Sequence, residues 1–221
     1  MRSLAFVLFA FVALPSISPQ DRNTQNPAGP GKPFTLTQVW TLDATYSDKQ
    51  HGVTFRYPRI WKPTAQFGYN PPALTQETPK PIAGFGYEEG GFPRDRVVGP
   101  YSTTNLEGFG IVYSAAPAAN AAECDARANS MLEMSEHRTV VFGGRAFSER
   151  EKGEGGMSQS NSGKLYATYV HPNCYLFETD VATASADDIR DLTRAQLRVI
   201  ETHLLDIMKS VRIVPSEGKS D

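Results

Sequence analysis

The chain is poor in cysteine and histidine and has no excess of charge of one sign, and each scarcity excludes a class of function. Its 221 residues include two cysteines and four histidines. Cys124 and Cys174 lie too far apart for a CxxC redox motif or a zinc-ribbon site. The 22 basic and 24 acidic residues nearly balance. The composition therefore gives no electrostatic reason to bind nucleic acid or anionic lipid.

The sequence also lacks an apolar run of the roughly 20 residues that cross a bilayer as a helix. Its apolar run at residues 4–14 follows Arg2 and ends at Pro15. A positive charge, a short apolar core and the small residues Ser16 and Ser18 predict a secretory signal peptide at residues 1–18. The alternative is a buried N-terminal strand. No cysteine lies near the predicted cut to carry a lipid. We therefore expect an exported protein, periplasmic or extracellular, without stable membrane insertion.

The rest of the chain predicts one domain. Residues 19–35 are rich in Pro, Asn, Gln and Gly and indicate a flexible polar leader. Residues 36–215 have the length of one well-cored domain, and residues 216–221 form a polar tail.

Apolar alternation predicts strands in the first half of that domain, at residues 39–42, 53–57, 82–87 and 109–115. Residues 88–108 are rich in Gly and Pro and indicate a surface loop. Asn120, with Glu123 three residues later, predicts the start of a first helix.

In the second half we expect strands at residues 139–142, 144–150, 165–171 and 174–181, the last two forming a hairpin. Residues 152–163 carry few side chains that could pack and indicate a mobile loop. Apolar residues at helical spacing predict a long helix over residues 186–209 with Ser185 as its N-cap, followed by a strand at residues 211–214. The resulting fold class is α+β, an α/β/α sandwich with a mainly antiparallel sheet flanked by two helices.

Three stretches together resemble the PsbP-like domain family. They are residues 52–58 with Trp61, the hairpin at residues 164–181, and the end of the long helix at residues 208–213. The resemblance spans residues 39–215 and implies an α/β/α sandwich on an antiparallel sheet, found in exported bacterial proteins. It also implies a binding or assembly role, because members of the family are mostly regarded as binding or assembly factors. The family has no universal catalytic residues that could be assigned here. The loop at residues 88–108 and the cysteine pair are departures from the family pattern.

In an oxidising compartment, Cys124 and Cys174 are more naturally a disulfide than a metal pair. The alternative is two separate buried thiols. The four histidines do not pair at helical spacing, so we predict no metal site, no cofactor and no catalytic residue.

Two candidate binding regions remain. Gln196 and His203 fall within the apolar face of the long helix and are candidates to line a polar pocket. The alternative is a partly buried pair satisfied by hydrogen bonds. Phe92 and Tyr101, in the Gly/Pro-rich loop, are candidates for a recognition surface. The alternative is that both rings belong to the core.

Three functions follow from these patterns. The first is a non-catalytic exported domain that binds a protein or an envelope component. The second is a small-ligand or metal-binding protein that uses a cleft beside the C-terminal helix. The third, an exported hydrolase, has the least support, because no nucleophile and base lie in a recognisable pattern. The sequence does not identify the partner, and it does not predict the oligomeric state.

Overall fold

A computed structural model describes residues 34–64, 79–89, 99–132, 137–156, 159–185 and 189–214. The predicted signal peptide, most of the polar leader, Phe92 and the polar tail lie outside these ranges.

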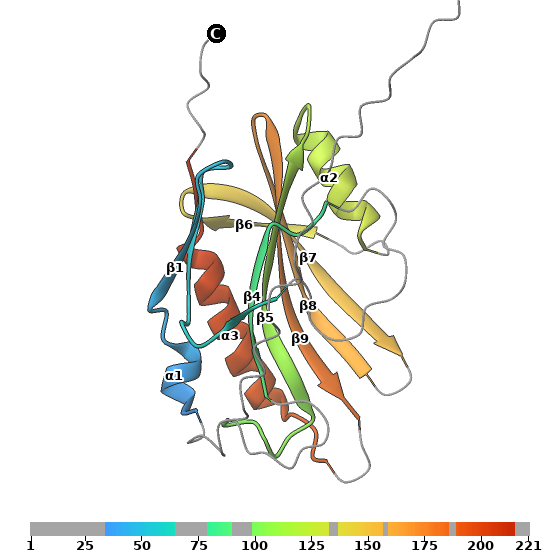
Figure 1. Ribbon diagram of the computed structural model, residues 1–221. Coiled ribbons are helices and arrows are strands. Elements are labelled where there is room, and N and C mark those ends of the chain that lie inside the picture. The colour runs from blue at the N-terminus through green and yellow to red at the C-terminus, as the bar shows by residue number, and fades with distance from the viewer. Residues whose placement is uncertain are drawn as a thin grey trace, which may run out of the picture.

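The larger of two sheets has seven strands in the order β3-β4-β5-β9-β8-β7-β6 (Figure 1). Every neighbouring pair in it is antiparallel. In chain order the strands are β3 (Lys62–Pro63), β4 (Ala83–Glu88), β5 (Leu106–Pro117), β6 (His137–Phe142), β7 (Arg145–Gly156), β8 (Gln159–Val170) and β9 (Asn173–Ala184).

The smaller sheet has three antiparallel strands, β1 (Ala44–Asp48), β2 (Val53–Tyr57) and β10 (Arg212–Ile213). Gly52, with φ 68°, makes the turn between β1 and β2, and its carbonyl accepts a hydrogen bond from the Val214 amide. A Cβ at position 52 would lie 1.8 Å from the Val214 oxygen, so only glycine fits where the chain end returns to this turn.

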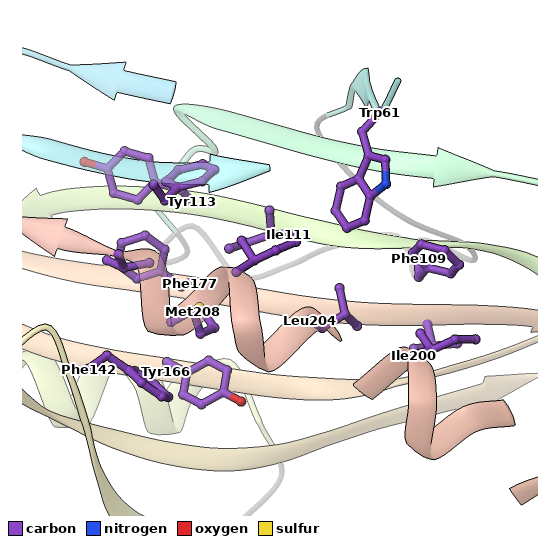
Figure 2. Packing of buried hydrophobic residues seen from close by; sticks show 14 of the residues in the cluster. Trp61, Phe109, Ile111, Tyr113, Phe142, Tyr166, Phe177, Ile200, Leu204 and Met208 are labelled. Carbon is purple, nitrogen blue, oxygen red and sulfur yellow. The ribbon is translucent and has the colours of Figure 1, made fainter. Parts of the chain in front are cut away.

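Alternating side chains on β8 and β9 supply two hydrophobic cores, one on each face of the large sheet. Tyr166 and Phe177 belong to the larger core, which also includes the smaller sheet and the helix α3 (Arg194–Ser210). Leu165 and Leu176 belong to a smaller core under the helix α2 (Ala121–Ser130). Figure 2 shows side chains of α3 against the sheet, with Met208 near Phe177 and Ile200 near Phe109.

One disulfide and one buried arginine hold α2 on its face of the sheet. Cys124 in α2 and Cys174 in β9 form a disulfide, the pair that the sequence predicted. Arg150 in β7 is only 1% exposed and donates hydrogen bonds to Asp125 and Asn129 of α2 at 3.1 and 2.8 Å. A buried guanidinium is stable only when its donors are satisfied, so this contact fixes the rotation of the helix.

The predicted α/β/α sandwich is wrong. The described residues are mostly β, in two separate antiparallel sheets, with only three helices. The first reason is that β1, β2 and β10 form a sheet of their own on the α3 side and do not extend the central sheet. The second is that residues 152–156 and 159–163, within the stretch expected to be a loop, lengthen β7 and β8 to 12 residues each.

Two other predicted elements are also wrong. Residues 39–42 do not form a strand. Instead, α1 (Leu36–Trp40) includes the first two of these residues, and Thr35 and Gln38 form a capping box at its start. The long helix begins later than expected and is capped by Thr193, not Ser185. The first helix does begin after Asn120, whose side chain accepts the Glu123 amide at 2.9 Å.

Replacing both Cys124 and Cys174 with Ala is expected to lower the free energy of unfolding by about 4 kcal/mol, because the disulfide closes a ring of about 51 residues in the unfolded chain. Urea denaturation of the oxidised protein measures this loss. Reductant should destabilise the wild type and leave the double variant unchanged. An oxidised wild type no more stable than the double variant would contradict the expected contribution.

Candidate functional site

A cleft of about 360 Å³ lies between α3 and strands β6 to β9 of the large sheet. Its sheet wall carries charged and polar groups, among them Arg138, Glu149 and Lys164. Val181 of β9 and Leu204 and Leu205 of α3 make its apolar part. The volume falls within the range of small-molecule sites, roughly 300–1,000 Å³, which combine apolar walls with a few placed polar groups.

Glu149 of β7 is the centre of an ion-pair network on the sheet wall. Its side chain is 3% exposed, and its Oε1 accepts hydrogen bonds from Arg138 Nε at 2.7 Å and Lys164 Nζ at 2.9 Å. Arg138 Nη2 also lies 2.6 Å from the same oxygen. The strand register produces this cluster, since Arg138 is directly opposite Glu149, and Glu149 is opposite Tyr166. Two cations thus compensate the cost of burying one carboxylate.

Tyr166 of β8 also contacts this network. Burial raises the pKa of its phenol above the ordinary value, and the Glu149 and Glu151 carboxylates raise it further, while Arg138 acts in the opposite direction. Tyr166 therefore stays protonated and supplies a hydroxyl to the cleft.

Lys152, which also borders the cleft, directs its charge elsewhere. Its Nζ lies 2.7 Å from Glu178 Oε2 and 3.1 Å from Asp180 Oδ1. Burial alone would lower the pKa of Lys152, but these two carboxylates hold it above its ordinary value. Because Glu178 alternates with Phe177 along β9, this cluster lies on the α2 face of the sheet. The Lys152 charge is therefore not available to the cleft.

The helix wall of the cleft is formed by Arg198, Glu201, Thr202 and Leu205. At 100° per residue these four lie on roughly the opposite side of α3 from Gln196 and His203. The structure thus contains a cleft beside the C-terminal helix, but the two residues predicted to line it are not among its lining residues.

Gln196 caps the start of α3. Its side-chain oxygen accepts a hydrogen bond from the Thr193 amide at 3.0 Å, and its own amide donates to Thr193 Oγ1 at 3.2 Å. This is a capping box, which stabilises the first turn of a helix. The structure therefore gives Gln196 a structural role at the helix start.

His203 packs against α1. Its ring stacks on Trp40, with centroids 4.5 Å apart, and Trp40 stacks in turn on Phe109 at 4.4 Å. Burial lowers the pKa of His203 below its ordinary value, and Asp206 opposes this shift. His203 therefore joins the N-terminal helix to the core.

Tyr101, the other described candidate, lies in the core. Its side chain is 3% exposed, its ring meets Phe109 edge to face, and its hydroxyl accepts a hydrogen bond from Trp40 Nε1 at 3.3 Å. Tyr101 is therefore not on the surface for which the sequence suggested it. Phe92, its expected partner, lies outside the described residues.

A second, more open hollow of about 560 Å³ lies beside the β1–β2 turn. Asp48 and His51 line it, with His51 Nδ1 2.6 Å from Asp48 Oδ2. The Tyr113 hydroxyl donates to the same carboxylate at 3.3 Å, and the Tyr175 hydroxyl donates to the His51 carbonyl at 3.0 Å. Burial alone would raise the pKa of Asp48, but hydrogen bonds from His51 and Gln50 hold it below its ordinary value. Through these two tyrosine hydroxyls, Asp48 and His51 join the β1–β2 turn to the large sheet.

Within the part of the chain that the structure describes, no helix is long and apolar enough to cross a bilayer. Nor do three or more His, Cys, Asp or Glu side chains gather there in a way that could hold a metal ion.

The chain matches no protein-family model, and no curated protein matches it either. Membership of the PsbP-like family therefore stays a prediction. A solved structure from Bacteroides thetaiotaomicron is 11% identical, with a TM-score of 0.42 over 81% of this chain and 51% of that one, so this chain spans about half its length. LpqN of Mycobacterium tuberculosis, described as involved in cell envelope biogenesis, is 8% identical, with a TM-score of 0.39 over 83% and 90% of the two chains. Similarities this distant do not transfer a function.

Sequence reasoning missed the charged residues of the cleft. Glu149 lies two residues after the buried Phe147 and so shares its face of β7. A carboxylate on the apolar face of a strand needs a cation beside it. That alternation could have identified Glu149, but its partner Lys164 directly follows the stretch that was expected to be a loop.

We expect His203 to make stability pH-dependent. The unfolded chain binds a proton at about pH 6.5, whereas the folded imidazole resists protonation. The contribution is therefore complete above about pH 6.5 and is lost as the pH falls toward the lowered pKa of the folded state. Urea denaturation at about pH 7.5 and about pH 5.5 should show a smaller loss of stability in His203→Phe, which keeps a ring against Trp40. Equal losses in the two proteins would contradict this role.

Proposed function

We propose that this chain is an exported, non-catalytic domain that binds a small organic molecule in the cleft between α3 and the large sheet. The observation that carries the proposal is the composition of this cleft. Apolar side chains from Val181, Leu204 and Leu205 meet a fixed set of charged and hydroxyl groups within about 360 Å³. Small-molecule sites are built in this way, with apolar area for affinity and polar groups for orientation.

The volume sets the size of the molecule. At roughly 30 Å³ for each water molecule, the cleft holds about a dozen waters. A ligand of about ten non-hydrogen atoms would replace most of them. This size is too small for a folded partner and suits a metabolite-sized molecule.

The state of the polar groups supports binding over catalysis. Glu149 is held by two cations at 2.9 Å or less. Tyr166 keeps its proton, because its pKa is raised. A general acid or base works best with a pKa near the ambient pH. The sheet wall is therefore suited to holding a ligand in a fixed orientation.

The sequence suggested a small-ligand site in a cleft beside the C-terminal helix, and the proposed site lies there. The residues that line it are not the expected Gln196 and His203. The first function, recognition of a protein or an envelope component through residues 88–108, stays a prediction. One of the two residues suggested for that recognition surface, Tyr101, is buried and cannot contact a partner there.

Filling the cleft should abolish binding without unfolding the domain. Thr202 is exposed on the helix wall, so Thr202→Trp places a ring in the cleft and leaves the core packing intact. The probe is a mixture of small apolar molecules of about ten non-hydrogen atoms, chosen to match the cleft. Two-dimensional NMR of the wild type should show shifted resonances for Val181 and Leu205, and affinity should fall at least about tenfold in the variant.

Val199→Trp is the matched control, because Val199 is exposed on the same helix and does not line the cleft. It should bind the probes as the wild type does. Shifts confined to the Asp48–His51 hollow, or equal binding by Thr202→Trp, would contradict the proposal.

A further inference from the structure

The charged side chains of the cleft differ in burial and in the strength of their ion pairs. This difference indicates which kind of ligand the cleft can bind. The sheet wall carries two cations, Arg138 and Lys164, and the helix wall carries a third, Arg198. Only one acid, Glu149, is fixed among them, since it is 3% exposed and bound by both sheet cations. The buried Glu149 carboxylate is stable only beside these two cations, so it stays in place as part of the wall.

Glu151 is held much less firmly. Its side chain is 75% exposed, and its carboxylate lies 3.4 Å from Lys164 Nζ. An ion pair with so exposed a carboxylate contributes little to stability. A ligand carboxylate can therefore take its place beside Lys164, while Glu151 turns into solvent at little cost.

Arg198 supplies the second contact for such a head group. It lines the cleft from α3, and the described part of the chain gives it no ion pair. Its planar guanidinium can bind a carboxylate through two parallel hydrogen bonds. Arg198 and Lys164 thus offer donors from the two walls.

The remaining acids limit the charge of the ligand to one. Glu149 stays in place, and Glu201 lies one turn after Arg198 on the same wall. A second negative charge would meet these carboxylates, so a dianion such as a phosphate monoester is disfavoured. Beyond the head group, Val181, Leu204 and Leu205 present only apolar surface.

We propose that the cleft binds a monocarboxylic acid with a short apolar chain, its carboxylate between Arg198 and Lys164 and its chain along Leu204 and Leu205. This inference rests on the proposed function, since it names the ligand class of the same cleft. An acid of about ten non-hydrogen atoms fits the volume.

Three probes of equal chain length test the head group: octanoate, octan-1-ol and octylammonium. Titrations followed through the NMR resonances of Val181 and Leu205 give each affinity and confirm that binding is in the cleft. Octanoate should bind most tightly. Arg198→Gln should weaken octanoate about threefold to tenfold and leave octan-1-ol unchanged, since only the charged head uses the guanidinium. Glu151→Gln should tighten octanoate about twofold to fivefold, because the competing carboxylate is gone.

Arg194→Gln is the matched control. Arg194 is exposed one turn before Arg198 on the same helix and does not line the cleft. It removes the same charge and should leave all three affinities unchanged. If octan-1-ol binds as tightly as octanoate and Arg198→Gln has no effect, the carboxylate preference is wrong while binding in the cleft stands. The preference is also wrong if octylammonium binds most tightly, or if none of the three probes shifts the resonances of the cleft residues. In either case, the comparison of Thr202→Trp with the wild type tests whether the cleft binds small molecules at all.

Discussion

The fold depends on burying both faces of β9. Tyr175 and Phe177 contribute to the core under α3, whereas Cys174 and Leu176 contribute to the core under α2. A sheet buried on both sides needs a cover on each side, and α2, with 10 residues, is too short to be stable alone. The disulfide and the buried Arg150 hold it in place. The opposite face of the large sheet is covered by α3 and the small sheet.

The cleft follows from how α3 lies on that face. The apolar side of the helix, Ile200, Leu204, Ile207 and Met208, belongs to the larger core with Phe109, Ile111 and Phe177. One edge of the helix faces Trp40 through His203, and the other faces the polar surface of β6 to β8. There the sheet carries charges in place of apolar side chains. Glu149 with its two cations makes this surface stable, and the space above it is the cleft.

The sequence predicted the features that depend on local pattern. The cap at Asn120, the hairpin around residues 171–174 and the pairing of Cys124 with Cys174 are all present. It did not predict features set by distant contacts. Residues 152–156 and 159–163, rich in Gly and Ser, form strands because β7 pairs with β8 and β8 pairs with β9 along this stretch. Val39 and Trp40 have strand propensity, yet the capping box at Thr35 and the stack on His203 place them in a helix. The cleft residues were missed for the same reason, since Arg138, Glu149 and Lys164 meet only through the register of three strands.

The most direct test of this account is the position of a bound ligand. Isotope-filtered NMR of the labelled protein with unlabelled octanoate measures which protein protons lie within a few ångströms of the chain. We expect contacts from the octanoate methyl group and methylenes to the methyl groups of Val181, Leu204 and Leu205. Contacts to Ile82 and Ala115 instead would place the ligand in the Asp48–His51 hollow and contradict the assignment of the α3 cleft as the binding site.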